Sequence, residues 1–406
     1  MKILAPFLSW QSEIQAIRRD IHAHPELAYQ EQRTADVVAA TLEGWGIPIH
    51  RGLGGTGVVG IIVGRSAGSR AIGLRADMDA LPMQELNTFP HASQHKGKMH
   101  GCGHDGHTAM LLNAARYLVE HKNFDGTVYV IFQPAEEGGA GARHMMDDGL
   151  FIKFPMDAVF GMNNWPGIPV GNFGVTPGPI MASSNVFAIT LRGKGAHGGM
   201  PNLGVDPIMA AVQIAQSLQT IITRNRNPLD AAVLSITQIH AGSADNVIPT
   251  EALMRGTVRT FTLETLDLIE TRMREIVQHS AAAMGCEVDF HFTRTYPPTV
   301  NHVRETEFCT RIMESIVGAD HVNDHVEPTM GAEDFSFMLL DVPGCYAWIG
   351  NGTGDHRLSG HGLGPCTLHN GSYDFNDALL PLGATYWVKL AEEWFKQEIA
   401  ATLNND

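Results

Sequence analysis

The chain has 406 residues, of which 44% are hydrophobic and 17% are charged. This composition is typical of a folded globular protein and excludes a disordered chain, and the length indicates two or three domains. With 28 basic and 43 acidic residues the formal net charge is −15, which argues against nucleic acid or an anionic membrane surface as a partner, because both attract positive charge.

The first part of the chain alternates helices with short strands rich in β-branched residues. A helical pattern runs from Trp10 to Gly46. After it, strands are predicted at Val58–Val63, Ala71–Arg75, Thr127–Phe132 and Ala158–Met162, and helices at Thr108–Glu120 and Ala140–Asp148. Short apolar strands separated by helices predict a largely parallel sheet that is covered on both faces.

Near Ala182 the order changes to strand, helix, strand, strand, helix, strand, which is the split βαβ arrangement of a ferredoxin-like domain. These elements are predicted at Asn185–Arg192, Asp206–Arg224, Ala231–His240, Ala252–Phe261, Leu263–Met284 and Glu287–Arg294. The first pattern then resumes, with elements at Glu305–Val317, Cys345–Ile349 and Ala378–Phe395. We therefore predict the α/β fold class: a domain with a mixed, mostly parallel sheet (residues 1–182 and 298–406) and an inserted ferredoxin-like (βαββαβ) satellite domain (183–297).

Cysteine usage and the N-terminus bear on the compartment. Five cysteines is an odd number, and they are scattered through a long chain, which favours a reducing environment over a disulfide framework. The N-terminal segment has no clean small-x-small cleavage site, so we do not expect a signal peptide. The longest nearly continuous apolar stretch, Val58–Gly64, is far shorter than the about 20 residues that cross a bilayer. We expect a cytoplasmic protein that does not enter a membrane.

The densest polar cluster is His100-Gly-Cys102-Gly-His104-Asp-Gly-His107, directly before a predicted helix. Three histidines, a cysteine and an aspartate on a glycine-rich loop are able to converge on one point, as transition-metal coordination requires. The alternative is a polar turn with surface histidines, but the density of donors and the cysteine favour a metal. Among such donors, Cys102 is better interpreted as a ligated thiolate than as a catalytic nucleophile.

Further acids and an imidazole follow other predicted strands. Glu136 and Glu137 come after the strand that ends at Phe132, and Asp79 comes after the strand that ends at Arg75. Ligands bind at the carboxyl ends of parallel strands, and two adjacent carboxylates point in different directions, so that one can ligate a metal while the other transfers protons. Helix-capping acids are the alternative interpretation. His369, far downstream, adds another candidate imidazole, for which a satisfied histidine in a loop is the alternative interpretation.

Motifs of other enzyme classes are absent or misplaced. A GxGxxG string at Gly55–Gly60 precedes a strand instead of joining a strand to a helix, so it does not indicate dinucleotide binding. The sequence contains no phosphate-binding GxxxxGK[ST] loop, no HExxH and no GxSxG. A metal centre is therefore the main chemical hypothesis.

The series RADMDALPM, HGCGHDGHTAM, QPAEEGGAGA, GKGAHGGMP, NVIP, GTVR, GAEDFS and LHNGSYDFND, in this order, resembles the co-catalytic metallopeptidase family of aminoacylases, hippurate hydrolases and auxin-conjugate amidohydrolases. The resemblance covers nearly the whole chain. It implies a catalytic α/β domain that binds two divalent metals (Mn, Zn, Co or Ni) and a satellite domain that mediates dimerisation. We accordingly expect a homodimer acting on a small-molecule substrate.

Carried over motif by motif, the resemblance assigns the metal ligands to Cys102, His104, Glu137 and His369. It makes Glu136 the general base, and Asp79 an acid at the edge of the site. In the satellite domain it implies that His197 reaches the substrate carbonyl oxygen, often across the dimer. Asn246 and Arg259 would hold the substrate carboxylate, with Gly331 in a neighbouring loop.

One position departs from the family pattern. Asn163, in the segment Gly161-Met-Asn-Asn-Trp-Pro166, stands where family members usually have a histidine ligand. An amide oxygen is a harder and weaker donor than imidazole toward metals such as Zn²⁺. We therefore expect one of the two metal positions to be weakened, emptied or changed in its metal preference.

The function that follows from the resemblance is hydrolysis of the amide bond of N-acyl amino acids, with a metal-bound hydroxide as nucleophile and Glu136 as general base. Two alternatives stay open. The first is another amidohydrolase of the same fold, such as a dipeptidase, a desuccinylase or deacetylase, or a carbamoyl-amino-acid hydrolase. The second is a metal- or ligand-binding protein whose activity has lapsed because of Asn163.

Overall fold

The computed structural model describes residues 1–397, and the chain divides into two compact units. The large unit comprises Met1–Gly178, Asn301–Glu327 and the described residues from Phe337 onward, and the small unit comprises Pro179–Val300 and Pro328–Ser336. The last part of the predicted 298–406 segment, residues 398–406, lies outside the described residues. No helix within residues 1–397 is both long and apolar enough to cross a membrane.

The large unit is built on an eight-stranded mixed sheet with the order β1-β2-β4-β3-β5-β16-β6-β15. The central strands β4, β3, β5 and β16 are mutually parallel, whereas β2 is antiparallel to both β1 and β4. The strands of this sheet are β1 Ile49–Leu53, β2 Gly57–Val63, β3 Ala71–Asp77, β4 Thr127–Gln133, β5 Ala158–Pro166, β6 Phe173–Gly174, β15 Val322–Asn323 and β16 Gly344–Gly352. The predicted mixed, mostly parallel sheet is confirmed.

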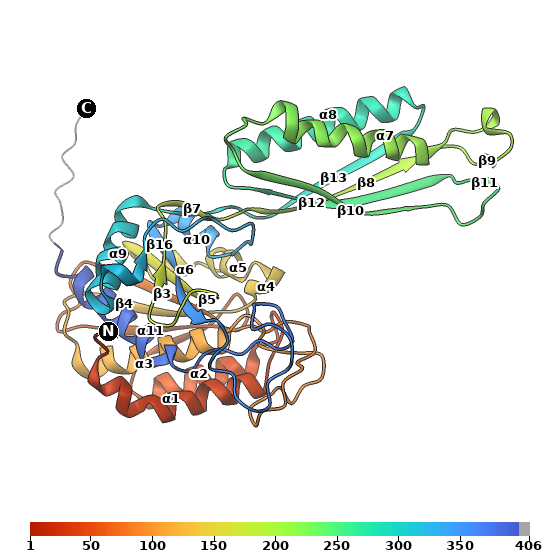
Figure 1. Ribbon diagram of the computed structural model, residues 1–406. Helices are drawn as coiled ribbons and strands as arrows, with labels where there is room; N and C mark the ends of the chain where they lie inside the picture. Colours follow the sequence, from red (N-terminus) through yellow and green to blue (C-terminus); the bar gives the residue numbers. More distant parts are fainter. Residues whose placement is uncertain (398–406) are drawn as a thin grey trace, which may run out of the picture. The chain divides into compact units, whose positions relative to one another are not determined.

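Helices lie against this sheet (Figure 1). They are α1 Ala5–Ala23, α2 Gln32–Gly44, α3 His104–His121, α4 Glu136–Gly139, α5 Gly141–Asp147, α6 Leu150–Lys153, α9 Val303–Val317, the 3₁₀ turn η3 Ala319–His321, α10 Ser336–Asp341 and α11 Leu379–Trp394. The helical pattern predicted from Trp10 to Gly46 corresponds to two helices, α1 and α2, because the chain leaves the first helix after Ala23. Pro25 disfavours helical backbone at the residue before it, which ends α1.

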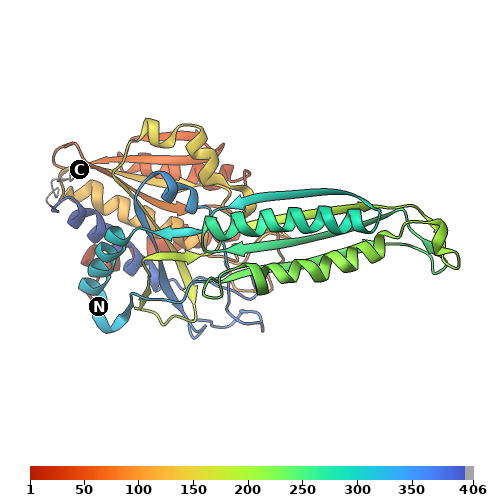
Figure 2. The same ribbon diagram turned by 90° about the horizontal axis from the view of Figure 1, so that it is seen from above.

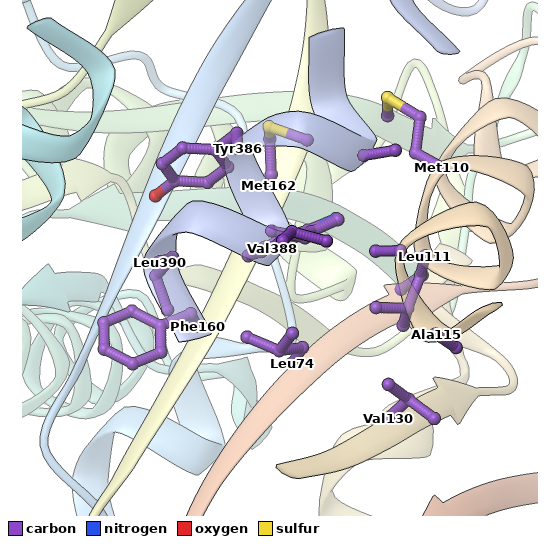
Figure 3. Packing of buried hydrophobic residues seen from close by; sticks show 14 of the residues in the cluster. Leu74, Met110, Leu111, Ala115, Val130, Phe160, Met162, Tyr386, Val388 and Leu390 are labelled. Atoms are coloured by element: carbon purple, nitrogen blue, oxygen red, sulfur yellow. The ribbon is translucent and has the colours of Figure 1, made fainter. Parts of the chain in front are cut away.

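The core of the large unit joins α3 and α11 to the central strands. The labelled part of this core in Figure 3 comes from β3, β4, β5, α3 and α11, and each of its residues is at most 2% exposed. All of these residues belong to one buried cluster (Figure 3): Leu74, Met110, Leu111, Ala115, Val130, Phe160, Met162, Tyr386, Val388 and Leu390. Burying one large apolar side chain contributes about 1.5–3 kcal/mol, so this core fixes the start of α3 firmly relative to β3, β4 and β5.

The small unit has a four-stranded antiparallel sheet with the order β10-β12-β8-β13. Two long helices lie side by side on one face of it (Figures 1 and 2). Its main elements are β8 Ser184–Arg192, α7 Pro207–Thr220, the π-helical turn η2 Ile221–Asn225, β10 Ala232–Ala241, β12 Glu251–Thr260, α8 Leu263–Ala283 and β13 Glu287–Tyr296. The predicted βαββαβ order is confirmed.

Short elements complete the described chain. A two-stranded ribbon in the small unit pairs β9 Ala196–His197 with β11 Val247–Ile248, close to the 3₁₀ turn η1 Pro201–Leu203. A second small sheet pairs β7 Gly178–Met181 with β14 Thr299–Asn301. All five cysteines are free and buried, and the reducing compartment expected from them stays a prediction.

Candidate functional site

Three parallel strands deliver polar residues to the same edge of the large sheet. Asp77 ends β3, Gln133 ends β4, and Asn163 lies near the end of β5. Because β3 pairs in parallel with both β4 and β5, the loops that follow these strands meet at their carboxyl ends, where open α/β sheets bind ligands.

The first group of donors combines a thiol, a carboxylate and an imidazole. One ligand atom each from Cys102, Glu137 and His369 lie within 4.8 Å of one another, and the Nε2 atom of His369 is 3.1 Å from Oε1 of Glu137. The backbone of His369 has a positive φ of 59°, and its N–H donates a 2.8 Å hydrogen bond to the carbonyl of Gly101. The strained residue is thus tied to the loop that carries Cys102.

The second group consists of His104, Glu136 and Glu137, again with one atom each within 4.8 Å. Nε2 of His104 is 4.0 Å from a carboxylate oxygen of each glutamate. Glu137 therefore belongs to both groups and joins them into one cluster of five side chains, which we call the donor cluster: Cys102, His104, Glu136, Glu137 and His369. Glu137 would therefore contribute to both groups if they hold metal ions, which would polarise a substrate carbonyl and activate water.

Asp79 lies directly behind the donor cluster and is 1% exposed. Its two carboxylate oxygens accept hydrogen bonds from the backbone N–H groups of Glu136 (3.0 Å) and Glu137 (2.9 Å). Oδ1 is also 3.3 Å from Nδ1 of His104. A carboxylate on one imidazole nitrogen leaves the other nitrogen to face a metal, so Asp79 orients three members of the cluster.

The loop that carries the two glutamates has an unusual backbone. Ala135 adopts left-handed angles (φ 54°, ψ 42°), which are strained for a residue with a side chain. Its N–H donates a 2.9 Å hydrogen bond to Glu31, a fully buried carboxylate that also accepts a hydrogen bond from Thr56. Burial raises the pKa of Glu31. This support could not be predicted from local sequence patterns, because Glu31 is more than 100 positions away from Ala135.

His107, the third histidine of the loop motif, is positioned differently from His104. Its Nδ1 is 2.6 Å from Asp77, and its Nε2 accepts a 2.9 Å hydrogen bond from the backbone N–H of Asn164. Arg75 forms a 2.7 Å ion pair with the same aspartate. One atom each of Asp77, His104 and His107 lie within 4.8 Å of one another. Because both ring nitrogens of His107 are already hydrogen-bonded, we interpret Asp77 and His107 as structural residues that pack behind the donor cluster.

Asn163 is 6% exposed, and its side-chain oxygen makes a long contact of 3.5 Å with the amide of Asn164. The next residue of β5, Asn164, connects this strand to the loop of Cys102 and to Tyr373. Asn164 donates a 2.6 Å hydrogen bond to the carbonyl of Cys102 and accepts one of 2.7 Å from the hydroxyl of Tyr373. Ligation by Asn163 stays a prediction.

The electrostatics of the donor cluster fit a divalent cation. Burial, together with Glu137, raises the pKa of the Cys102 thiol. Hydrogen bonds with Cys102 and Glu137 raise the pKa of His369 to about 10. Without a metal, the Cys102 thiol and the His369 imidazole thus tend to keep their protons. A divalent cation that binds between these groups would displace those protons. Thiolate and imidazole suit Zn²⁺, Co²⁺ or Ni²⁺, and the carboxylates also suit Mn²⁺.

The remaining predicted residues lie in the small unit. His197 is on β9, opposite Val247 of β11, and the carbonyl of Asn246 accepts a 2.7 Å hydrogen bond from Gly198, so His197 and Asn246 are neighbours on this ribbon. Arg259 is on β12, eight residues beyond Glu251, which corresponds to about 26 Å along an extended strand.

The ribbon of β9 and β11 lies at one end of the four-stranded sheet (Figure 1). Arg259, the ninth residue of β12, lies near the other end of its strand, so the structure does not bring it to the ribbon within one chain. Burial lowers the pKa of the Arg259 guanidinium. The carbonyl of Gly331 accepts a hydrogen bond from Ala182. Roles in substrate binding for these four residues stay predictions.

Comparisons with known proteins identify the family of the chain. The model of "Peptidase family M20/M25/M40" matches residues 73–393. A hippurate hydrolase of Campylobacter jejuni is 39% identical over 98% of this chain and 100% of its own length. An N-acetylcysteine deacetylase of Bacillus subtilis is 39% identical over 92% of this chain and 95% of its own. The crystal structure of a B. subtilis protein described as a dinuclear metal-binding peptidase of the M20 family superimposes with a TM-score of 0.82 at 34% identity, covering 96% of this chain and all of the other.

Proposed function

The chain belongs to peptidase family M20/M25/M40, and from this premise we propose that it is a metal-dependent amidohydrolase that cleaves the amide bond of N-acyl amino acids. The observation that carries the proposal is the donor cluster, in which Glu137 is shared by two groups of ligands and Glu136 stands beside it. Relatives named for hippurate and N-acetylcysteine support an acyl group joined to an amino acid as the substrate class.

Two divalent metals are proposed for the cluster. Cys102, Glu137 and His369 would hold one, and His104 and Glu137 would hold the other. Such metals lower the pKa of a bound water toward 7 and polarise a substrate carbonyl. With Asn163 as its remaining ligand, the second position is proposed to bind more weakly, because an amide oxygen is a poorer ligand than imidazole.

Glu136 is proposed as the general base. Its side chain is 6% exposed, and the hydrogen bond from its backbone to Asp79 fixes its position next to His104. The carboxylate would take a proton from the attacking water and deliver it to the nitrogen of the leaving amino acid. A positioned acid–base group of this kind contributes about 10²–10⁴-fold to the rate.

For the small unit we propose substrate contacts and dimerisation. In one chain, His197 and Asn246 lie at the β9–β11 ribbon. Arg259 lies near the opposite end of β12. They are able to serve one substrate only if two copies of the chain contribute. We therefore propose a homodimer in which one copy supplies His197 to the carbonyl oxygen and Arg259 pairs with the substrate carboxylate, a charge-assisted contact that fixes orientation.

The test combines an activity panel with a matched pair of variants. Hippurate, N-acetyl amino acids, dipeptides, N-succinyl and N-carbamoyl amino acids are assayed with Mn²⁺, Zn²⁺, Co²⁺ or Ni²⁺. Glu136→Gln should retain its metal and lose turnover about 10²–10⁴-fold, whereas Glu137→Gln should lose metal as well. Near-normal turnover of Glu136→Gln would remove that residue from the mechanism. Metal binding without hydrolysis of any substrate would favour a binding protein with lapsed activity.

A further inference from the structure

A fully buried arginine lies next to the donor cluster but is not part of it. Arg18, in the middle of α1, has no exposed side-chain surface and forms ion pairs with three aspartates. Its Nε is 2.7 Å from Asp105, one Nη is 2.7 Å from Asp374, and the other is 3.4 Å from Asp377. Arginine presents its N–H groups in a rigid planar fork, so it fixes the relative positions of the carboxylates that it contacts.

The two carboxylates closest to Arg18 belong to the two chain segments that carry His104 and His369 of the donor cluster. Asp105 follows His104 directly in the first turn of α3. Asp374 follows His369 by five residues and lies in the same loop before α11. His22, one helical turn after Arg18, adds a 2.8 Å contact to Asp105. The guanidinium thus bridges two parts of the chain more than 260 residues apart.

Neutral hydrogen bonds join the same two segments. The backbone N–H of His369 donates to the carbonyl of Gly101 at 2.8 Å. The hydroxyl of Tyr373 donates to Asn164 at 2.7 Å, and Asn164 donates to the carbonyl of Cys102 at 2.6 Å. The ion pairs of Arg18 therefore add a charged link to the hydrogen bonds that already connect residues 101–105 with residues 369–374.

We propose that Arg18 is a positioning residue for the metal centre: by bridging Asp105 and Asp374 it holds the segment of Cys102 and His104 at the distance from His369 that metal binding requires. This inference rests on the proposed function in so far as the cluster binds metal. Arg18 contacts neither the substrate nor the metal ligands directly, and it acts through the two aspartates.

The charges explain why no smaller group would serve. Asp105 and Asp374 are both buried, and Arg18 is a cation that contacts both of them, whereas His22 contacts Asp105 and His361 contacts Asp374. Without the guanidinium, the two carboxylates would lose the cation that they share, because His22 lies beside Asp105 and His361 lies beside Asp374. A lysine would keep a positive charge but would lose the planar fork that reaches both carboxylates.

The experiment compares Arg18→Lys and Arg18→Met with Arg19→Met as a matched control. Arg19 is the next residue of the same helix, is 43% exposed, and contacts Asp377 on the surface side. Purified proteins are freed of metal, their unfolding is followed by circular dichroism, and Co²⁺ and Mn²⁺ are titrated by calorimetry. The visible absorption of the Co²⁺ protein reports the geometry of its ligands independently of activity.

We expect both Arg18 variants to bind Co²⁺ about 10–100-fold more weakly, the range typical when a partner of a metal ligand is removed, and to show an altered Co²⁺ spectrum. Arg18→Lys should lie between wild type and Arg18→Met, and Arg19→Met should match wild type. If Arg18→Met does not fold, Asp374→Asn, which weakens one arm without changing its shape, carries the same expectation.

The inference is overturned if the Arg18 or Asp374 variants lose thermal stability while metal affinity and the Co²⁺ spectrum stay at wild-type values, since Arg18 would then be a structural ion pair only. That outcome would leave the proposed function intact. If the unsubstituted protein itself binds no metal at the cluster, the proposed function fails, and this inference fails with it.

Discussion

Asp79→Asn tests how the donor cluster is oriented. The carboxylate accepts the backbone N–H groups of both Glu136 and Glu137 and contacts His104. Asparagine keeps one acceptor oxygen, but its NH₂ group faces a backbone N–H that then has no acceptor. A buried hydrogen bond to a charged group contributes about 1.5–3 kcal/mol, so we expect the free energy of unfolding of the metal-free protein to fall by about the same amount.

The same change should weaken metal binding, because the loop of the two glutamates and the ring of His104 lose their common anchor. Removing a group that hydrogen-bonds to a metal ligand typically lowers metal affinity about 10–100-fold. Urea unfolding of the metal-free proteins measures stability, and titration with Co²⁺ or Mn²⁺ measures affinity.

Glu26→Gln is the matched control, because Glu26 also accepts two backbone N–H groups, those of Arg33 and Thr34 at the start of α2. It should cost stability and leave metal affinity unchanged. If Asp79→Asn lowers stability but binds metal as tightly as Glu26→Gln, the idea that Asp79 serves the cluster is refuted.

Three further predictions follow from single groups. Asn163→His should raise the number of metal ions per chain measured by elemental analysis, and an unchanged number would show that Asn163 does not weaken a site. Although burial opposes it, the carboxylates Asp105 and Glu85 raise the pKa of His22 to about 9. The raised pKa stabilises the fold by about 3 kcal/mol below pH 6.5, and this stability is lost as the pH rises from 6.5 to 9. His22→Gln should remove that slope from urea-unfolding data, and an identical slope would exclude His22. Because the metal-free pKa of His369 is about 10, metal binding near pH 7.5 should release protons, seen as a dependence of the calorimetric heat on buffer ionisation; equal heats in all buffers would contradict this.

Much of the fold was predictable because its signals are local. The strands Ala71–Asp77, Thr127–Gln133 and Ala158–Pro166 are short, largely apolar runs, and such runs indicate buried parallel strands. The antiparallel insertion of β2 between β1 and β4 was not predictable in the same way, since its seven residues are as apolar as those of a parallel strand. Its direction is set by the short turn that joins it to β1.

The donors that the structure brings together stand in dense local motifs, which is why the sequence pointed to Cys102, His104 and Glu137. The residues that orient them are single charges far away in the chain, such as Arg18 and Glu31. For Arg18 a signal did exist: it follows Ile14 by four residues and so lies on the buried face of α1. A charge on an apolar helix stripe indicates a buried partner, but the sequence does not say which one.

The most direct test of the metal centre is anomalous X-ray diffraction, at the absorption edge of the bound metal, from crystals grown with Zn²⁺ or Mn²⁺. We expect a strong peak about 2.0–2.3 Å from the sulfur of Cys102, Nε2 of His369 and a carboxylate oxygen of Glu137, with a weaker peak beside Nε2 of His104. Peaks elsewhere, or none between these side chains in protein that hydrolyses an N-acyl amino acid, would contradict the proposed site.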